Sequence, residues 1–162
     1  MILAATGHRP QKLGGYSEAV YQRLVDLATM VLIKHDPTQV ISGMALGWDQ
    51  AWCEAAIRQD IPVIAAVPFA GQESRWPVAS QTRYLHLIDQ CAEVVITCEG
   101  GYSPAAMQRR NCWMVDHCDK VIALWDGTTG GTHNCVMYAR KVEREILNYW
   151  TSWVKYSGVN QV

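Results

Sequence analysis

The residues best suited to chemistry in this chain lie in a glycine- and threonine-rich segment near position 130. Asp126 precedes Thr129, Gly130, Gly131 and Thr132, and a helical pattern begins directly after them. Free backbone N–H groups at a helix start, together with the helix dipole, favour a bound anion. We interpret this segment as a phosphate contact, although a plain flexible turn has a similar composition.

A second glycine-bearing segment runs from Ser42 and Gly43 to Gly47 and Asp49. Its glycines also stand between an apolar run and a predicted helix, which is where backbone N–H groups can face an anion. The spacing matches neither the dinucleotide fingerprint nor the Walker P-loop, so the pattern alone is weak. Asp49 is interpreted either as a helix cap or as an acceptor for a sugar or base.

The first apolar run, residues 2–6, leads into Thr6, Gly7, His8 and Arg9. Glycine allows the backbone to turn sharply and to approach a ligand closely. The planar guanidinium of Arg9 suits a phosphate or a carboxylate. This segment is predicted to contact the ligand, the alternative being an ordinary strand-to-helix turn with solvated charges.

Aromatic and polar residues alternate after the third apolar run, at Pro68, Phe69, Gln72 and Trp76. Such a mixture suits a pocket wall on which a planar ring stacks. The alternative is a loop that Phe69 and Trp76 anchor in the core. We include all four residues in the predicted ligand site.

Acidic residues with a clear catalytic arrangement are not evident. Glu73, Glu99 and Asp126 are weak candidates for a general acid, a base or a nucleophile, and Asp49 is a further carboxylate that a hydrolase could use. None has a convincing partner at a useful spacing. Enzymatic activity therefore stays open.

Two adjacent arginines, Arg109 and Arg110, follow a predicted helix start at Ser103 and Pro104. Serine is a good N-cap, and proline is favoured at the first helical position. The arginines are interpreted either as surface charges or as phosphate ligands, within one subunit or across an interface.

Composition limits the class of protein. The chain has 162 residues, 49% of them hydrophobic, and a formal net charge of −1. Because proteins that bind nucleic acid usually carry a basic face, nucleic-acid binding is not expected to be its main role. The six cysteines form no C-x-x-C pair, which favours reduced thiols over a metal site. Without a leader-like or membrane-spanning run, we expect a cytoplasmic protein with no membrane partner.

Short apolar runs alternate with helical patterns along the chain, which is typical of a parallel sheet covered on both faces. We predict a Rossmann-like three-layer α/β/α domain over residues 1–155, with a mainly parallel sheet of at least five strands and a short tail at 156–162. The last helix is expected to start near Gly131 and to continue through Trp153. In such sheets ligands bind at the carboxyl ends of the strands. The strands are expected at residues 2–6, 39–42, 62–67, 93–97 and 120–125.

In their order and spacing these segments resemble the SLOG superfamily, which includes the LOG phosphoribohydrolases and the Rossmann-like part of DprA, and most of all its YpsA-like branch. The resemblance covers about residues 1–140 and implies a homodimer or higher oligomer with a nucleotide pocket. The LOG enzymes carry a catalytic glutamate shortly after a Gly-Gly-x-Gly-Thr motif. Here His133, Asn134 and Cys135 follow Thr132, and the next glutamate is Glu143.

The function expected from these observations is binding of a nucleotide or nucleotide derivative, such as a relative of NAD or ADP-ribose, by a sensor or sequestering module. No cofactor is required for this role, apart from the nucleotide-type ligand itself. One alternative is a nucleotide N-glycosidic hydrolase. Another is a DprA-like mediator of recombination that binds single-stranded DNA, which would need a basic groove with stacking aromatics.

Overall fold

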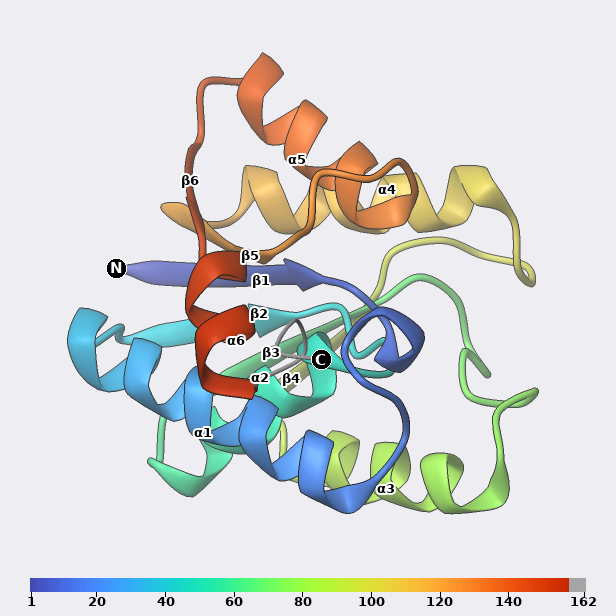
Figure 1. Cartoon of the computed structure of the whole chain (residues 1–162). Helices are drawn as coiled ribbons and strands as arrows, with labels where there is room; N and C mark the ends of the chain where they lie inside the picture. Colours follow the sequence, from blue (N-terminus) through green and yellow to red (C-terminus); the bar gives the residue numbers. More distant parts are fainter. Residues whose placement is uncertain (158–162) are drawn as a thin grey trace.

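Short apolar runs pair into one parallel sheet at the centre of the molecule (Figure 1). The computed structural model describes residues 1–157. Within this part the strands are β1 (Ile2–Gly7), β2 (Gln39–Ser42), β3 (Val63–Val67), β4 (Glu93–Ile96), β5 (Lys120–Leu124) and β6 (Glu145–Asn148). Their spatial order is β4-β3-β2-β1-β5-β6, with every neighbouring pair parallel. The predicted sheet of at least five strands is confirmed.

Helices cover both faces of this sheet. They are α1 (Glu18–His35), α2 (Trp48–Arg58), α3 (Val78–Asp89), α4 (Pro104–Asp116), α5 (Gly131–Lys141) and α6 (Trp150–Ser157), with a short 3-10 helix η1 (Pro10–Lys12) after β1. One apolar cluster joins the sheet to α1, α2, α3 and α6, and a smaller one joins it to α4 and α5. The three-layer α/β/α prediction is therefore confirmed. In the described residues, no helix is both long and apolar enough to cross a membrane.

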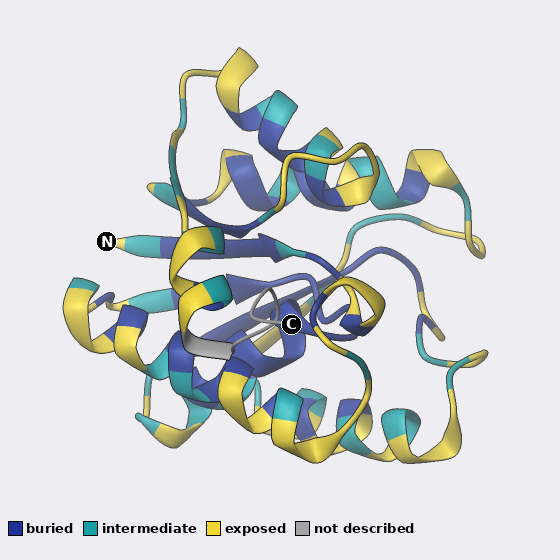
Figure 2. Cartoon of the chain, viewed as in Figure 1, coloured by how far each residue is buried: buried dark blue, intermediate teal, exposed yellow. Residues whose placement is uncertain are grey.

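The burial pattern explains why the central strands are continuous apolar runs in the sequence. Every residue of β3 is buried, and the interior of β1 is buried as well, because helices lie on both sides of them. Figure 2 shows this dark-blue centre, with the exposed residues on the outer faces of the helices. The edge strands β4 and β6 are largely exposed or half-buried.

Local capping agrees with the sequence at the start of α4. The Ser103 hydroxyl accepts a hydrogen bond from the Ala106 backbone N–H at 2.9 Å, and Pro104 takes the first helical position. Ser17 caps α1 in the same way, through the Val20 backbone N–H at 3.2 Å. These caps satisfy N–H groups that the helix itself leaves free.

The C-terminal segment differs from the prediction of one long helix. After α5, Glu143 takes a left-handed conformation with φ of 57°, and the chain turns back into β6, which pairs with β5. α6 then places Trp153, which is 0% exposed, in the core beside α1. The apolar residues from Val142 to Trp153 have helical spacing, but in the structure most of them belong to the short strand β6 and the short helix α6. α6 extends to Ser157; the remainder of the predicted tail, 158–162, lies outside the described residues.

The strand order creates a crevice at the carboxyl edge of the sheet. From β1 the chain adds β2, β3 and β4 on one side, and then adds β5 and β6 on the other side. Connections leave β1 and β5 in opposite directions, and open α/β sheets bind ligands at such a switch point. The loops after β1 and β5 therefore face one another across the middle of the molecule.

Candidate functional site

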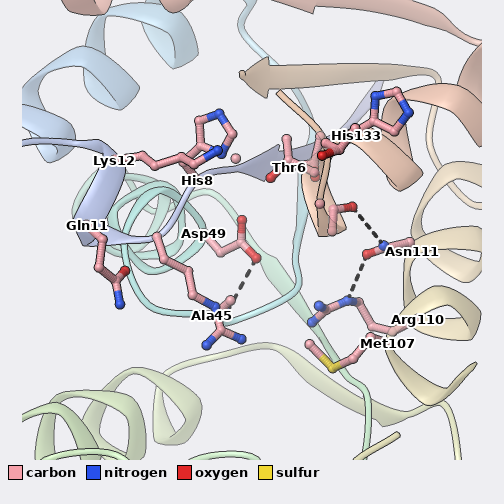
Figure 3. Close-up of a pocket in the computed structure, with 16 residues that line it drawn as sticks. Thr6, His8, Gln11, Lys12, Ala45, Asp49, Met107, Arg110, Asn111 and His133 are labelled. Atoms are coloured by element: carbon pink, nitrogen blue, oxygen red, sulfur yellow. Dashed lines mark hydrogen bonds between the residues drawn. The ribbon is translucent and has the colours of Figure 1, made fainter. Parts of the chain in front are cut away.

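A pocket of about 370 Å³ opens at this switch point (Figure 3). Its walls come from the end of β1, from the loops after β1, β2 and β5, and from helices α2, α4 and α5. The predicted ligand residues that line it are Thr6, Gly7, His8, Arg9, Asp49, Thr129, Gly130, Gly131 and Thr132. Segments that lie far apart in the sequence thus meet at one rim. We call this the glycine-lined pocket.

A second pocket of about 750 Å³ adjoins the first. The predicted residues Phe69, Gln72 and Trp76 line it, and it shares Arg9 and Met107 with the glycine-lined pocket. We call this the aromatic pocket. The shared residues make the two pockets neighbouring parts of one larger site.

Aromatic rings form the wall of the aromatic pocket and also anchor it. Phe69 is 9% exposed and meets the Tyr102 ring edge-on, with 6.4 Å between the centroids. Trp76 packs edge-on against Tyr84, which belongs to the core, at 5.3 Å. The rings therefore reach the core and also face the pocket, while stacking of a ligand on them stays a prediction.

The remaining predicted residues shape the site from behind. Ser42 donates a hydrogen bond to the Asp49 carbonyl at 2.7 Å, and Pro68 is buried at the end of β3. The Gly43 carbonyl accepts hydrogen bonds from Arg110 Nη1 at 2.6 Å and Gln72 Nε2 at 3.2 Å. Ser42, Gly43 and Pro68 line neither pocket, and Ser42 and Gly43 bond to residues that do.

Gly47 fixes the approach of α2 to the loop after β1. It has a φ of 92°, and a Cβ added there would lie 2.6 Å from the His8 carbonyl oxygen. The adjacent Trp48 backbone N–H donates to that same oxygen at 3.4 Å. A side chain at position 47 would therefore separate the two segments that border the glycine-lined pocket.

Asp126 lies behind His8 rather than in a pocket wall. Its backbone N–H donates to His8 Nε2 at 3.0 Å, and its Oδ1 lies 2.8 Å from the same nitrogen. Thr128 donates to Oδ1 from its backbone N–H at 2.9 Å and from its hydroxyl at 2.5 Å. Burial alone would raise the pKa of Asp126, but the bonds from Thr128 and the neighbouring His8 lower it to about 2. This carboxylate joins the loops after β1 and β5.

Two buried charges of opposite sign face the glycine-lined pocket. Asp49 and Arg110 are each 5% exposed. Burial raises the pKa of Asp49 to about 6, although Arg110 and the Ala45 backbone N–H oppose the shift. Burial likewise lowers the pKa of Arg110, and Asp49 opposes that shift. Because Gly47 is the N-cap of α2, Asp49 does not cap this helix.

Helix α4 adds lining residues outside the predicted set, among them Asn111 and also Arg110, which the sequence left open as a surface charge or a phosphate ligand. Arg110 Nε donates to Asn111 Oδ1 at 3.2 Å, and Asn111 Nδ2 donates to the Gly131 carbonyl at 3.4 Å. Arg110 is thus buried rather than a surface charge, whereas Arg109 is exposed and contacts Cys98. The other lining residues outside the prediction are Gln11, Lys12, Ala45, Met107 and His133.

The weak catalytic candidates do not gather in the site. Glu99 is exposed, Glu73 is half-buried, and neither lines the glycine-lined or the aromatic pocket. Within residues 1–157, Asp49 is the one carboxylate that lines either pocket. The same described part holds no group of three or more His, Cys, Asp or Glu side chains that could hold a metal ion.

Comparisons with solved structures show the fold. DprA from Streptococcus pneumoniae superposes with a TM-score of 0.65 at 19% identity, covering 90% of this chain and 49% of that one. DprA from Helicobacter pylori gives a TM-score of 0.64 at 20% identity, covering 91% of this chain and 64% of that one. The chain therefore spans about half to two-thirds of the length of these structural neighbours.

Sequence comparison identifies the family. The SPbeta prophage-derived protein YoqJ of Bacillus subtilis (strain 168) is 32% identical over 135 residues, which are 74% of this chain and 79% of that protein. The family model of YpsA, described as the YspA SLOG family, matches residues 3–158. The predicted resemblance is confirmed, and the chain belongs to the YpsA family of SLOG proteins.

Proposed function

We propose that this protein binds a phosphorylated nucleotide or nucleotide derivative, such as a relative of NAD or ADP-ribose, as a sensor or sequestering module. The observation that carries the proposal is the pair of adjoining pockets, one rich in glycine and hydroxyl groups and the other aromatic, joined at Arg9. The phosphate occupies the glycine-lined pocket, and the base occupies the aromatic pocket.

The phosphate subsite is built from the start of α5 and from two cations. Gly130 is the N-cap and supplies no side chain to satisfy the first N–H groups of the helix. Arg9 is exposed and, within the described residues, its guanidinium forms no hydrogen bond or ion pair. Lys12 lies in the same wall, near the Thr128 hydroxyl. Free amides and nearby positive charge favour a phosphate.

The base subsite rests on the rings of Phe69, Trp76 and Tyr102, which all line the aromatic pocket. Tyr102 is 69% exposed, so its ring is accessible to a ligand. Stacking on aromatic side chains contributes on the order of 1–3 kcal/mol per base and is tolerant of base identity. A pocket of about 750 Å³ is in the usual range for small-molecule sites.

Isothermal titration calorimetry with AMP, ADP, ADP-ribose and NAD tests the proposal. At least one of these ligands is expected to bind, and Arg9→Ala is expected to weaken that binding by about 1–3 kcal/mol, as for a lost charged hydrogen bond. Arg23→Ala serves as the matched control, because Arg23 is an exposed arginine on α1 outside both pockets. Absence of binding by the whole panel, or equal binding by Arg9→Ala and wild type, would contradict the proposal.

N-glycosidic hydrolysis of the bound nucleotide is a second candidate, favoured by the position of Asp49. A carboxylate beside the anomeric carbon can stabilise an oxocarbenium-like state, and Asp49 is buried in the wall of the proposed phosphate subsite. Chromatography of AMP incubated with the protein distinguishes the two roles. Release of adenine supports hydrolysis, whereas binding without turnover supports the sensor role.

Single-stranded DNA is an alternative ligand, suggested by the likeness of the fold to DprA. The Helicobacter pylori DprA structure is described for its single-stranded DNA binding mode, and here Arg9, Arg75 and Tyr102 line one pocket as a cation–aromatic set. The formal net charge of −1 gives weak electrostatic support. A gel shift with single-stranded DNA at physiological salt tests this ligand, and no shift at micromolar protein removes it.

Self-association is proposed as well. Val94 and Ile96, which are 44% and 54% exposed, lie on the edge strand β4. An apolar edge strand is a surface that a second copy of the chain can cover. Light scattering after size exclusion is expected to give at least a dimer mass, and a monomer mass at micromolar concentration would reject this proposal.

A further inference from the structure

One oxygen of the Asp49 carboxylate is buried without a partner. Oδ2 accepts a hydrogen bond from the Ala45 backbone N–H at 3.4 Å, whereas Oδ1 has no hydrogen-bond partner within the described protein. Figure 3 shows the two oxygens pointing apart, with the free one directed toward the side of the pocket where Thr6 lies. Buried acceptors normally receive a hydrogen bond, so we expect a donor from outside the described protein at this oxygen.

Arg110 does not satisfy this oxygen. The Arg110 guanidinium donates to the Gly43 carbonyl at 2.6 Å and to Asn111 at 3.2 Å. Within residues 1–157, Asp49 forms no ion pair with it at hydrogen-bonding distance. Arg110 thus lowers the electrostatic cost of the buried carboxylate but leaves Oδ1 available.

A second unpartnered acceptor lies along the same site. Gln72 is 8% exposed, its Nε2 is used by the Gly43 carbonyl, and its Oε1 has no partner within the described residues. Gln72 lines the aromatic pocket, as Asp49 lines the glycine-lined pocket. Each pocket therefore has one buried acceptor, Asp49 Oδ1 or Gln72 Oε1, that lacks a donor within the described residues. A ligand can supply that donor.

The charges around Asp49 decide which donor fits. Arg9, Lys12 and Arg110 line the same pocket, so a cationic group on the ligand would be repelled, whereas a neutral hydroxyl would not. The same pocket carries the proposed phosphate subsite at Gly130 and Gly131. A donor that must lie close to a phosphate, and be neutral, is a sugar hydroxyl.

We propose that Asp49 is a specificity residue that accepts a hydrogen bond from a ribose hydroxyl, so that the site selects ribonucleotides over their deoxy counterparts. This inference rests on the proposed nucleotide-binding function and adds the chemical class of ligand. It also separates this chain from a module for single-stranded DNA, whose sugar lacks one of these hydroxyls.

Protonation of Asp49 is expected to weaken the selection. The groups that face the carboxylate are Arg110 from α4, Arg9 from the loop after β1 and the Cys135 thiol from α5. Burial raises the pKa of Asp49 to about 6 in spite of the two arginines. Below that pH the carboxyl is neutral and is a weaker acceptor, so the preference for the hydroxyl declines.

The experiment is calorimetric titration of AMP, 2′-deoxy-AMP and 3′-deoxy-AMP into wild type and Asp49→Asn. Wild type is expected to bind AMP about tenfold to a hundredfold more tightly than at least one deoxy analogue, the scale of a hydrogen bond to a charged group. Asp49→Asn is expected to lose most of that ratio. Asp60→Asn is the matched control, because Asp60 is exposed just after α2 and lines neither pocket.

The outcomes separate this inference from the function on which it rests. Equal binding of all three nucleotides by wild type overturns the role of Asp49 while nucleotide binding stands. An unchanged ratio in folded Asp49→Asn also overturns it, whereas binding of none of the three, together with no binding of ADP, ADP-ribose or NAD, defeats both proposals together. Should the variant fail to fold, the wild-type ratio measured at pH 7.5 and pH 5 decides, since a ratio that does not fall at pH 5 contradicts the inference.

Discussion

Replacing Asp49 with asparagine is expected to stabilise the ligand-free protein at neutral pH. The carboxylate is 5% exposed, and burial raises its pKa from an ordinary 3.8 to about 6, even with Arg110 nearby. The neutral form is therefore the one that the folded interior prefers. Asparagine keeps the shape of the side chain and removes the charge, as protonation does.

The size of the effect follows from the shift in pKa. At 1.36 kcal/mol per unit, a shift from 3.8 to about 6 corresponds to about 3 kcal/mol in the free energy of unfolding. Because the folded state holds this proton more tightly than the unfolded state, the contribution of Asp49 to stability is greatest below pH 4 and is lost as pH rises toward 6. Asp49→Asn removes that loss, so its advantage is complete at pH 7.5 and absent at pH 4.

Urea unfolding of both proteins at pH 7.5 and pH 4 measures this difference. Asp126→Asn is the control of opposite sign, because its hydrogen bonds hold the pKa of Asp126 down to about 2. That carboxylate contributes stability above pH 3.8, which is lost as pH falls toward 2, so its neutral replacement is expected to destabilise the protein at pH 7.5. An Asp49→Asn variant less stable than wild type at pH 7.5 would contradict this expectation and show that attraction to Arg110 outweighs the cost of burial.

Packing at the site and at the C-terminal helix gives further tests. Gly43→Ala is expected to lower the free energy of unfolding by about 1–3 kcal/mol, because the new Cβ would lie 2.7 Å from Arg110 Nη1; Gly131→Ala, where nothing lies within 4 Å, is expected to leave urea-unfolding stability nearly unchanged. Trp153→Ala is expected to cost about 3–5 kcal/mol, because this ring is 0% exposed, while the exposed Ser152→Ala in the same helix serves as its control. A Trp153→Ala midpoint equal to that of wild type would show that α6 does not contribute to the core.

The central strands were predictable because burial on both faces leaves an unmistakable apolar run. β3 is an example, since all of Val63–Val67 is buried and the run carries no competing helical spacing. β6 was not predictable in the same way. It is an edge strand of four residues, half of them exposed, and its apolar residues continue the spacing of the helix before it.

The position of the site was predictable from chain order, but its full lining was not. Loops after β1 and β5 meet because parallel strands end at one edge, and this placed Arg9 and Gly130 correctly at one rim. Arg110 required tertiary information. A charged residue within a helix is usually exposed to solvent. Here α4 lines the pocket, and the buried Arg110 guanidinium donates hydrogen bonds to the Gly43 carbonyl and to Asn111.

The role of Asp126 also depends on tertiary contacts. Its position after a strand and before two glycines predicts a ligand contact, but it lines neither pocket, and His8 and Thr128 contact its Oδ1. Local sequence shows which polar groups lie at the carboxyl edge. Which of them remain free for a ligand depends on neighbours that are more than 100 residues away in the chain, as His8 is from Asp126.

A crystal structure of the protein with AMP tests whether the two adjoining pockets bind a nucleotide with its phosphate at the glycine-lined end. We expect the phosphate against the amides of Gly131 and Thr132 and beside Arg9, with the adenine between Phe69 and Trp76. A nucleotide bound outside both pockets, or bound with its base in the glycine-lined pocket, would contradict this expectation.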